Sequence, residues 1–195
     1  MGYTIDPVSA DCYPGTAILI NKFDIKDEQK LNEIEGVISS TRYAEWENNP
    51  TADSFDFEHY KAVHRYLFSD LYSWAGEIRT INISKKGTSF TPADDIESQA
   101  ALIFNRLKKQ NYFKNLPRDK FVDEIVEFYC VTNTLHPFCE GNGRTQRAFL
   151  SQLIRSAGFD IDFSAIDTEL LMIATIQSAQ GITDTLRQVF HENIK

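Results

Sequence analysis

The chain has 195 residues and a formal net charge of −8, with 42% hydrophobic and 25% charged residues. This composition is typical of a folded protein, and the length fits one domain with its own core. The negative charge would repel a phosphate backbone, so direct binding of nucleic acid is not expected. The three cysteines form no Cys-x-x-Cys pair, which argues against a disulfide framework or a zinc site and suits a reducing cytoplasm.

The N-terminal residues show no targeting signal. They lack a basic region followed by an apolar stretch, and no run in the chain approaches the roughly 20 apolar residues that cross a bilayer. We therefore expect a cytoplasmic protein that is neither exported by a signal peptide nor embedded in a membrane.

The hydrophobic pattern predicts one mainly helical domain over residues 1–195. The first 26 residues show no sustained period and indicate an irregular N-terminal arm, followed by a core at 55–160 and C-terminal helices at 161–195. Apolar residues at helical spacing predict helices over about residues 27–45, 56–72, 94–110, 119–135, 144–157, 164–179 and 182–193.

One short segment interrupts this helical pattern. The residues from Glu77 to Ile83 favour β structure and run through Lys85-Lys86-Gly87 into Thr88-Ser89-Phe90-Thr91, which predicts a single hairpin. Its two lysines can be read as a solvated turn or as cations near a phosphate or a target protein.

Most residues that could take part in catalysis or ligand binding lie in one loop between two amphipathic helices, His136-Pro137-Phe138-Cys139-Glu140-Gly141-Asn142-Gly143-Arg144-Thr145-Gln146-Arg147. Gly141 and Gly143 can take positive φ angles, which would turn backbone N–H groups inward as an anion nest at a helix N-terminus. Arg144 and Arg147 are three residues apart and can converge on one anionic ligand. The loop therefore predicts a phosphate site.

Two further side chains of this loop predict catalysis. Glu140 offers an oxygen ligand beside the phosphate site, and Mg²⁺ is commonly held by one carboxylate together with substrate phosphates and water. His136 is the one side chain of the loop that can accept a proton near neutral pH, which makes it the candidate general base. A simple helix–loop–helix joint with a glycine turn would not require this combination.

The loop resembles the signature of the Fic family, His-Pro-Phe-x-Asp/Glu-Gly-Asn-Gly-Arg-x-x-Arg, at every specified position. Upstream, Leu71–Arg79 is similar to the family's Tyr-x-Trp-Ala-Gly segment, so the resemblance covers about residues 55–160 well. It implies a Fic-type helical bundle with a β-hairpin flap. The implied activity is that of a protein adenylyltransferase, which moves AMP from ATP to a Tyr, Thr or Ser hydroxyl of a target protein and releases pyrophosphate.

The resemblance also implies a role for each residue of the motif. His136 would take the proton from the target hydroxyl, and Glu140 would bind Mg²⁺. The phosphates of ATP would be held by Gly141, Asn142, Gly143, Arg144 and Arg147. The hairpin would clamp an extended target segment by strand addition, with Lys86, Thr88 and Phe90 as flap residues.

Many Fic proteins contain an inhibitory helix of the form Ser/Thr-x-x-x-Glu-Gly/Asn, whose glutamate pairs with the second motif arginine. No segment of this chain fits that pattern completely, since Thr41-Arg42-Tyr43-Ala44-Glu45 is followed by Trp46, and Glu192-Asn193 lacks Ser or Thr four residues earlier. We therefore expect inhibition by a separate small antitoxin-like protein that presents a glutamate to Arg147, as in the toxin–antitoxin branch of the family.

Two alternative functions stay open. Some Fic-like proteins with altered motifs transfer phosphate or phosphocholine, and the intact Gly-Asn-Gly-Arg argues against that chemistry here. A non-catalytic nucleotide-binding module would need no base, so His136 and Glu140 argue for an enzyme. Outside the motif, His64 is predicted to be a core histidine of the second helix, and Trp74 to close the core under the hairpin.

Overall fold

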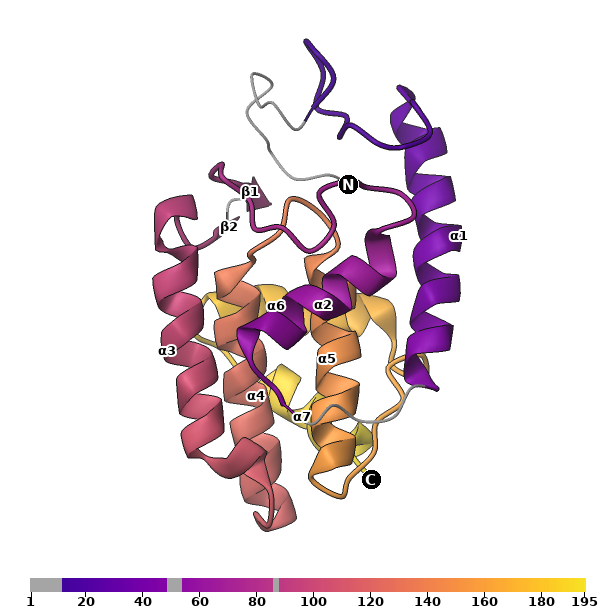
Figure 1. Ribbon diagram of the computed structural model, residues 1–195. Helices are drawn as coiled ribbons and strands as arrows, with labels where there is room; N and C mark the ends of the chain where they lie inside the picture. The colour runs from indigo at the N-terminus through magenta and orange to yellow at the C-terminus, as the bar shows by residue number, and fades with distance from the viewer. Residues whose placement is uncertain (1–11, 49–53, 86–87) are drawn as a thin grey trace.

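Figure 1 shows the computed structural model of the chain, which describes residues 12–48, 54–85 and 88–195. Its helices are α1 (Glu28–Glu47), α2 (Phe57–Phe68), α3 (Ile96–Lys109), α4 (Arg118–Leu135), α5 (Asn142–Ser156), α6 (Thr168–Ala179) and α7 (Asp184–Asn193). Two short strands, β1 (Ser84–Lys85) and β2 (Thr88–Ser89), pair antiparallel. The predicted mainly helical fold with a hairpin is confirmed for the described residues.

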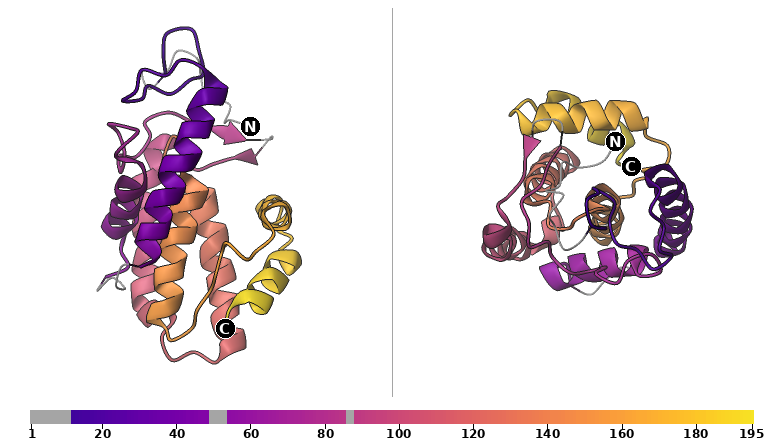
Figure 2. Two further views of the ribbon diagram at one scale, coloured as in Figure 1. Left: turned by 90° about the vertical axis from the view of Figure 1, so that its right-hand side faces the viewer. Right: turned by 90° about the horizontal axis from the view of Figure 1, so that it is seen from above.

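Helix α5 lies near the centre of the bundle. Viewed from above in Figure 2, it is surrounded by the other helices, and it contacts α1, α2 and α4. Its side chains Phe149, Leu150 and Leu153 are fully buried. Each buried side chain of this size contributes about 1.5–3 kcal/mol relative to exposure. Burial on several sides therefore fixes the position of the N-terminus of α5, where the motif lies.

An aromatic cluster joins the helices that surround α5. Phe149 makes edge-on contacts with Tyr60 of α2 and Phe104 of α3, with ring centroids 5.2 and 5.8 Å apart. Phe128 of α4 contacts both Phe104 and Phe149, with centroids 5.8 and 5.9 Å apart. Such ring pairs prefer these separations and stabilise the fold beyond their buried area. The cluster holds α4 and α5 side by side, so that the loop between them is anchored at both ends.

Acidic caps fix the starts of three helices. Asp27 and Asp56 accept the N–H groups of Lys30 and His59, which begins α1 and α2 close to the predicted positions. Asp167 accepts the N–H groups at the start of α6, at Glu169 and Leu170. Helix α6 therefore begins four residues later than residue 164, where the hydrophobic pattern alone had placed it.

The strands lie further along the chain than predicted. Residues 77–83 form no strand, and β1 begins only at Ser84, paired with Ser89. In the preceding segment the Ile81 carbonyl accepts a hydrogen bond from the Arg79 side chain, and the Arg79 N–H donates to Pro137. The Ile81 carbonyl and the Arg79 N–H are thus already hydrogen-bonded and are not available to a ladder. The turn residues Lys86 and Gly87 lie outside the described residues.

The N-terminal arm is irregular over residues 12–26, where one isolated bridge joins Cys12 to Leu19; residues 1–11 lie outside the described part. The hairpin lies at the same end of the bundle as the loop between α4 and α5 (Figure 1). Across the described ranges, no helix combines the length and apolar character that crossing a membrane requires.

Candidate active site

One cavity of about 1060 Å³ brings most of the predicted site residues together. It runs between α1, α5 and α6 and reaches the hairpin. The predicted residues that line it are His136, Glu140, Gly141, Gly143, Arg144, Arg147, Thr88 and Phe90. Small-molecule sites usually enclose about 300–1,000 Å³, so the cavity has room for a nucleotide. Of the other predicted residues, Asn142 does not line it, and Lys86 lies outside the described residues.

The two glycines of the motif have different roles, which corrects the expectation that both take positive φ. Gly141 has φ of 78° and caps α5, and a Cβ there would lie 2.4 Å from ring atoms of Phe68. Gly143 lies in the first turn of α5 and keeps a negative φ. An added Cβ at Gly143 would lie 3.3 Å from Nη1 of Arg147, so the absence of a side chain there leaves space for that guanidinium.

The Asn142 side chain braces the loop. It is 3% exposed; its Oδ1 accepts the N–H of Phe138 at 2.9 Å, and its Nδ2 donates to the Phe138 carbonyl at 2.7 Å. Since both polar groups of the side chain are used within the loop, a contact between residue 142 and a phosphate would come from its backbone N–H.

His136 ends α4 in a left-handed conformation, with φ of 43° and ψ of 59°. Its Nδ1 lies 3.0 Å from the carbonyl oxygen of Asn133; because that oxygen can only accept, Nδ1 carries the proton and Nε2 is the basic nitrogen. The ring stacks on Phe90 of the hairpin, with centroids 3.7 Å apart. Burial lowers the pKa of His136 to about 3, so the imidazole is neutral at neutral pH.

Arg144 lies between two carboxylates. Its guanidinium forms an ion pair with Glu35 of α1, donates to Ser39 at 2.7 Å, and lies 3.5 Å from Oε1 of Glu140. It also lies over the ring of Phe68, 4.8 Å from the centroid. Burial raises the pKa of Glu140 and the nearby Glu35 acts in the same direction, whereas Arg144 opposes them. The Glu140 carboxyl thus lies close to a second acid, Glu35, and both acids are paired with the single cation of Arg144.

Glu35 is a site residue that the sequence interpretation missed. It is 109 positions away from Arg144, and its carboxylate also accepts the hydroxyl of Tyr72. The available signal was an acid close to the predicted apolar stripe of the first helix, beside Leu31 and Ile38. The Glu35-Gly36 pair even matches the end of the inhibitory pattern, but Leu31 stands where that pattern has Ser or Thr.

Arg147, in contrast, has no carboxylate partner in the described part of the chain. Within residues 12–48, 54–85 and 88–195, its guanidinium makes no hydrogen bond or ion pair, although it lines the cavity beside Gly143. Glu45, the acid of the Thr-x-x-x-Glu segment, is bonded to Arg42 and Tyr66 instead. Of the two motif arginines, Arg147 is therefore the one whose charge is available to an anionic ligand.

His64 is a buried core histidine, as predicted, but its hydrogen bonds reach the motif. It is 0% exposed and stacks on Phe138 with centroids 3.9 Å apart. Its Nδ1 accepts the N–H of Gly76 at 2.8 Å, so Nε2 carries the proton and donates to the Glu140 carbonyl at 3.0 Å. This histidine thereby ties α2 and the Trp-Ala-Gly segment to the loop.

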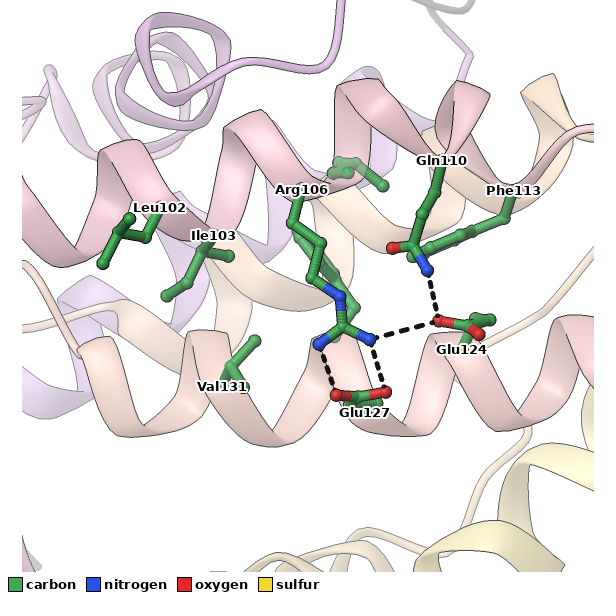
Figure 3. A pocket seen from close by; sticks show the side chains of 10 residues that line it. Leu102, Ile103, Arg106, Gln110, Phe113, Glu124, Glu127 and Val131 are labelled. Carbon is green, nitrogen blue, oxygen red and sulfur yellow. Dashed lines mark hydrogen bonds and ion pairs between the residues drawn. The ribbon is translucent and has the colours of Figure 1, made fainter.

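A second, smaller cavity of about 210 Å³ lies between α3 and α4 (Figure 3). Leu102, Ile103 and other apolar side chains line it, and Arg106 spans it to reach Glu124 and Glu127. Both of these carboxylates are thus paired with Arg106, and none of the motif residues lines the cavity. The larger cavity is therefore the candidate active site.

Known proteins resemble this chain in sequence and in structure. A sequence model described as the Fic/DOC family matches residues 54–154. The chain is 37% identical to "Probable protein adenylyltransferase y4lH" of Sinorhizobium fredii, over 87% of this chain and 88% of that protein. It is 31% identical to "Probable protein adenylyltransferase Fic" of Escherichia coli, over 91% and 88%. It is 33% identical to "Protein adenylyltransferase VbhT" of Bartonella schoenbuchensis over 93% of this chain, but it spans only 38% of that protein.

Solved structures give the same result for the fold. The BepC protein of Bartonella tribocorum with bound AMPPNP superposes with a TM-score of 0.90 at 26% identity, over 95% of this chain and 96% of that one. The N-terminal Fic domain of a VirB-translocated effector from Bartonella quintana with bound ADP also has a TM-score of 0.90, at 27% identity over 95% and 94%.

Proposed function

Because the chain belongs to the Fic/DOC family, we propose that it is a protein adenylyltransferase, which transfers AMP from ATP to a hydroxyl side chain of a target protein. The observation that carries this proposal is the convergence of His136, Glu140 and Arg147 on one cavity at the N-terminus of α5. A base, a carboxylate and an available cation around a nucleotide-sized space are what phosphoryl-group transfer requires. Relatives with bound AMPPNP and ADP support the choice of nucleotide.

The proposed reaction is an attack of the target oxygen on the α-phosphorus. Nε2 of His136 accepts the hydroxyl proton as the new O–P bond forms, and the bond from the α-phosphorus to the β-phosphate oxygen breaks, so that pyrophosphate leaves. The acceptor is a Tyr, Thr or Ser hydroxyl. The tautomer of His136 supports this step, because Nδ1 donates its proton to the Asn133 carbonyl and Nε2 is therefore the basic nitrogen.

The triphosphate would be bound by the first turn of α5 and by Arg147. The helix N-terminus offers backbone N–H groups and the positive end of the helix dipole. Arg147 adds a cation that has no carboxylate partner among the described residues, whereas Arg144 forms ion pairs with Glu35 and Glu140. We therefore assign the larger share of phosphate binding to Arg147.

Glu140 fits the protein part of a Mg²⁺ site. Its Oε1 accepts the N–H of Gly141 at 2.7 Å, which orients the carboxylate at the edge of the cavity. The described residues contain no group of three His, Cys, Asp or Glu side chains that could hold a metal ion. Mg²⁺ with one carboxylate, substrate phosphates and water suits this donor set. When bound, the ion would neutralise charge on the phosphates.

The hairpin is proposed to hold the target. Its strands are two residues long and form a two-stranded sheet, so an extended peptide can add to an open edge by backbone hydrogen bonds. Thr88 and Phe90 line the cavity beside His136, which would bring such a peptide close to the base. The role of Lys86 stays a prediction, because it lies outside the described residues.

We propose that a separate small protein inhibits the enzyme, as in a toxin–antitoxin pair, by presenting a carboxylate to Arg147. Glu35 contacts Arg144 instead of Arg147, and Glu45 is bonded elsewhere, so neither supplies the inhibitory carboxylate. Full AMP transfer by the isolated chain would support an external inhibitor. An isolated chain that is silent until Glu35 or Glu45 is replaced by glutamine would contradict it.

Transfer of label from ATP tests the proposed activity. The chain is incubated with a cell lysate and ATP labelled at either the α- or the γ-phosphate. Protein should take up label from the α position alone, and His136→Ala should lower the rate by about 10²–10⁴. His191→Ala, which alters an exposed histidine of α7, should leave it unchanged. Label from the γ position would identify a kinase, and no uptake from either would favour a binding module.

A further inference from the structure

Arg79, in the segment between α2 and β1, is a buried cation bound by carbonyl groups. It is 2% exposed. Its Nε donates to the His136 carbonyl at 2.9 Å, its Nη1 to that of Ile81 at 2.7 Å, and its Nη2 to that of Thr91 at 2.5 Å. None of the ion pairs among the described residues includes it. Burying an unpaired charge is costly, so the three carbonyl dipoles must offset the lost hydration.

The three carbonyl groups come from three different segments. Ile81 precedes β1 and Thr91 follows β2, so Arg79 joins the two stems of the hairpin, and the third carbonyl belongs to the candidate base. The guanidinium is planar with donors in fixed directions, and one such group can set the relative positions of three segments. Backbone bonds reinforce the arrangement: the Arg79 N–H donates to Pro137, and the Thr91 N–H donates to Thr134 at the end of α4.

The conformation of His136 depends on these contacts. A left-handed backbone costs a non-glycine residue about 1–2 kcal/mol and persists only where the surroundings fix it. Arg79 bonds the carbonyl of His136 through its side chain and that of Pro137 through its backbone. The imidazole stacks on Phe90, the residue before Thr91. Arg79 thus holds both the backbone of the base and the segment that covers its ring.

We propose that Arg79 is a positioning residue, which fixes the hairpin against His136 so that a peptide bound along the hairpin presents its hydroxyl to the imidazole. This inference rests on the proposed adenylyltransferase activity. Arg79 does not line the cavity, so it acts through His136 and the hairpin and not on the nucleotide.

The test is Arg79→Lys, with Arg118→Lys as a matched control. Lysine keeps the charge, but one ammonium group cannot bridge three carbonyls with the arginine geometry. Arg118 also binds two backbone carbonyls, those of His191 and Ile194, at a helix end outside the large cavity. At saturating ATP, Arg79→Lys should slow transfer of α-label to lysate protein by on the order of 10²-fold. Its affinity for AMPPNP should change by less than about threefold, and Arg118→Lys should match the unmodified chain in both.

A measurement without turnover separates this inference from the activity. Because the Phe90 ring stacks on the imidazole, the NMR signals of the His136 ring protons should be shifted upfield. Arg79→Lys should remove that shift, as Phe90→Ala should, while Arg118→Lys should keep it. If Arg79→Lys retains the shift, or retains the full transfer rate, the positioning role is wrong. If the unmodified chain transfers no label, the proposed activity fails, and the ring shift still decides the role of Arg79.

Loss of folding has its own control. Arg79→Gln is a second variant that keeps an amide donor without the charge. If both Arg79 variants lose cooperative unfolding while Arg118→Lys keeps it, Arg79 serves the fold alone and the positioning role is overturned. Folded variants with weakened AMPPNP binding and an unchanged His136 signal would also overturn it.

Discussion

Replacing Gly141 with alanine should destabilise the protein far more than the same change at Gly143. Gly141 has φ of 78°, and a Cβ there would lie 2.4 Å from two atoms of the Phe68 ring, which is 1% exposed and cannot move into solvent. Gly143 has no positive φ, and a Cβ there would meet only the tip of the flexible Arg147 side chain, at 3.3 Å.

The expected magnitudes follow from these two environments. The left-handed conformation costs alanine about 1–2 kcal/mol more than glycine. Overpacking against Phe68 adds about 1–3 kcal/mol. Gly141→Ala should therefore lower the free energy of unfolding by about 2–5 kcal/mol, a large share of the 5–15 kcal/mol typical of a native protein. At Gly143, the helix propensity of alanine favours folding by up to about 1 kcal/mol, which offsets a small shift of Arg147.

Urea unfolding followed by circular dichroism measures both changes, and equal m-values would show that the unfolded states are comparable. The reasoning is refuted if Gly143→Ala costs as much as Gly141→Ala, or if Gly141→Ala costs less than about 1 kcal/mol. Folded Gly143→Ala should still bind AMPPNP more weakly than the unmodified chain, because its Cβ displaces the guanidinium that lies beside it.

Three further predictions concern titration, the buried ion pair and the metal. Burial lowers the pKa of His64 and of His136 to about 3, so below pH 6.5 the unfolded chain binds protons that the folded chain does not. As the pH falls from 7.5 to 5, each histidine should lower the free energy of unfolding by about 2 kcal/mol. In urea unfolding, His64→Gln should remove the part of this pH dependence that His64 causes. An unchanged pH dependence in that variant would show that burial does not lower the pKa of His64. Glu35→Gln should lower the free energy of unfolding by about 1–3 kcal/mol, whereas Glu45→Gln, at the exposed pair with Arg42, should lower it by less than about 0.5 kcal/mol. Similar losses in the two variants would argue against a stabilising ion pair between Glu35 and Arg144. Chelation of divalent ions should stop AMP transfer without lowering the unfolding temperature of the nucleotide-free chain. Glu140→Gln should also stop AMP transfer. Transfer that persists in the presence of the chelator would exclude a required ion.

The motif could be recognised from the sequence because its residues are local. His136, Glu140, Gly141 and Arg147 lie within twelve consecutive positions, and a loop that joins two packed helices keeps them together whatever the rest of the chain does. Helix starts could be predicted for a similar reason, since Asp27 and Asp56 act on the turn that follows each of them.

The partners of these residues could not be read in the same way. Glu35 reaches Arg144 across 109 positions, and Arg79 reaches His136 across 57. Both are single charged residues, and nothing in the neighbouring sequence distinguishes them from charged residues on a solvated surface. The predicted strand boundary was wrong for a related reason. The Arg79 N–H donates to the distant Pro137 carbonyl, and the Arg79 side chain occupies the Ile81 carbonyl, so these groups do not join the ladder that local β preference predicted.

By itself, the sequence determined the helical bundle, the presence of a hairpin and the chemical groups of the candidate site, since helix period, capping and a contiguous loop are properties of neighbouring residues. Only the tertiary structure decided which cation is compensated and which is available, why one glycine needs a positive φ and the other does not, and how a buried arginine joins the hairpin to the base. These depend on which distant side chains share a low-dielectric space, and packing alone sets that.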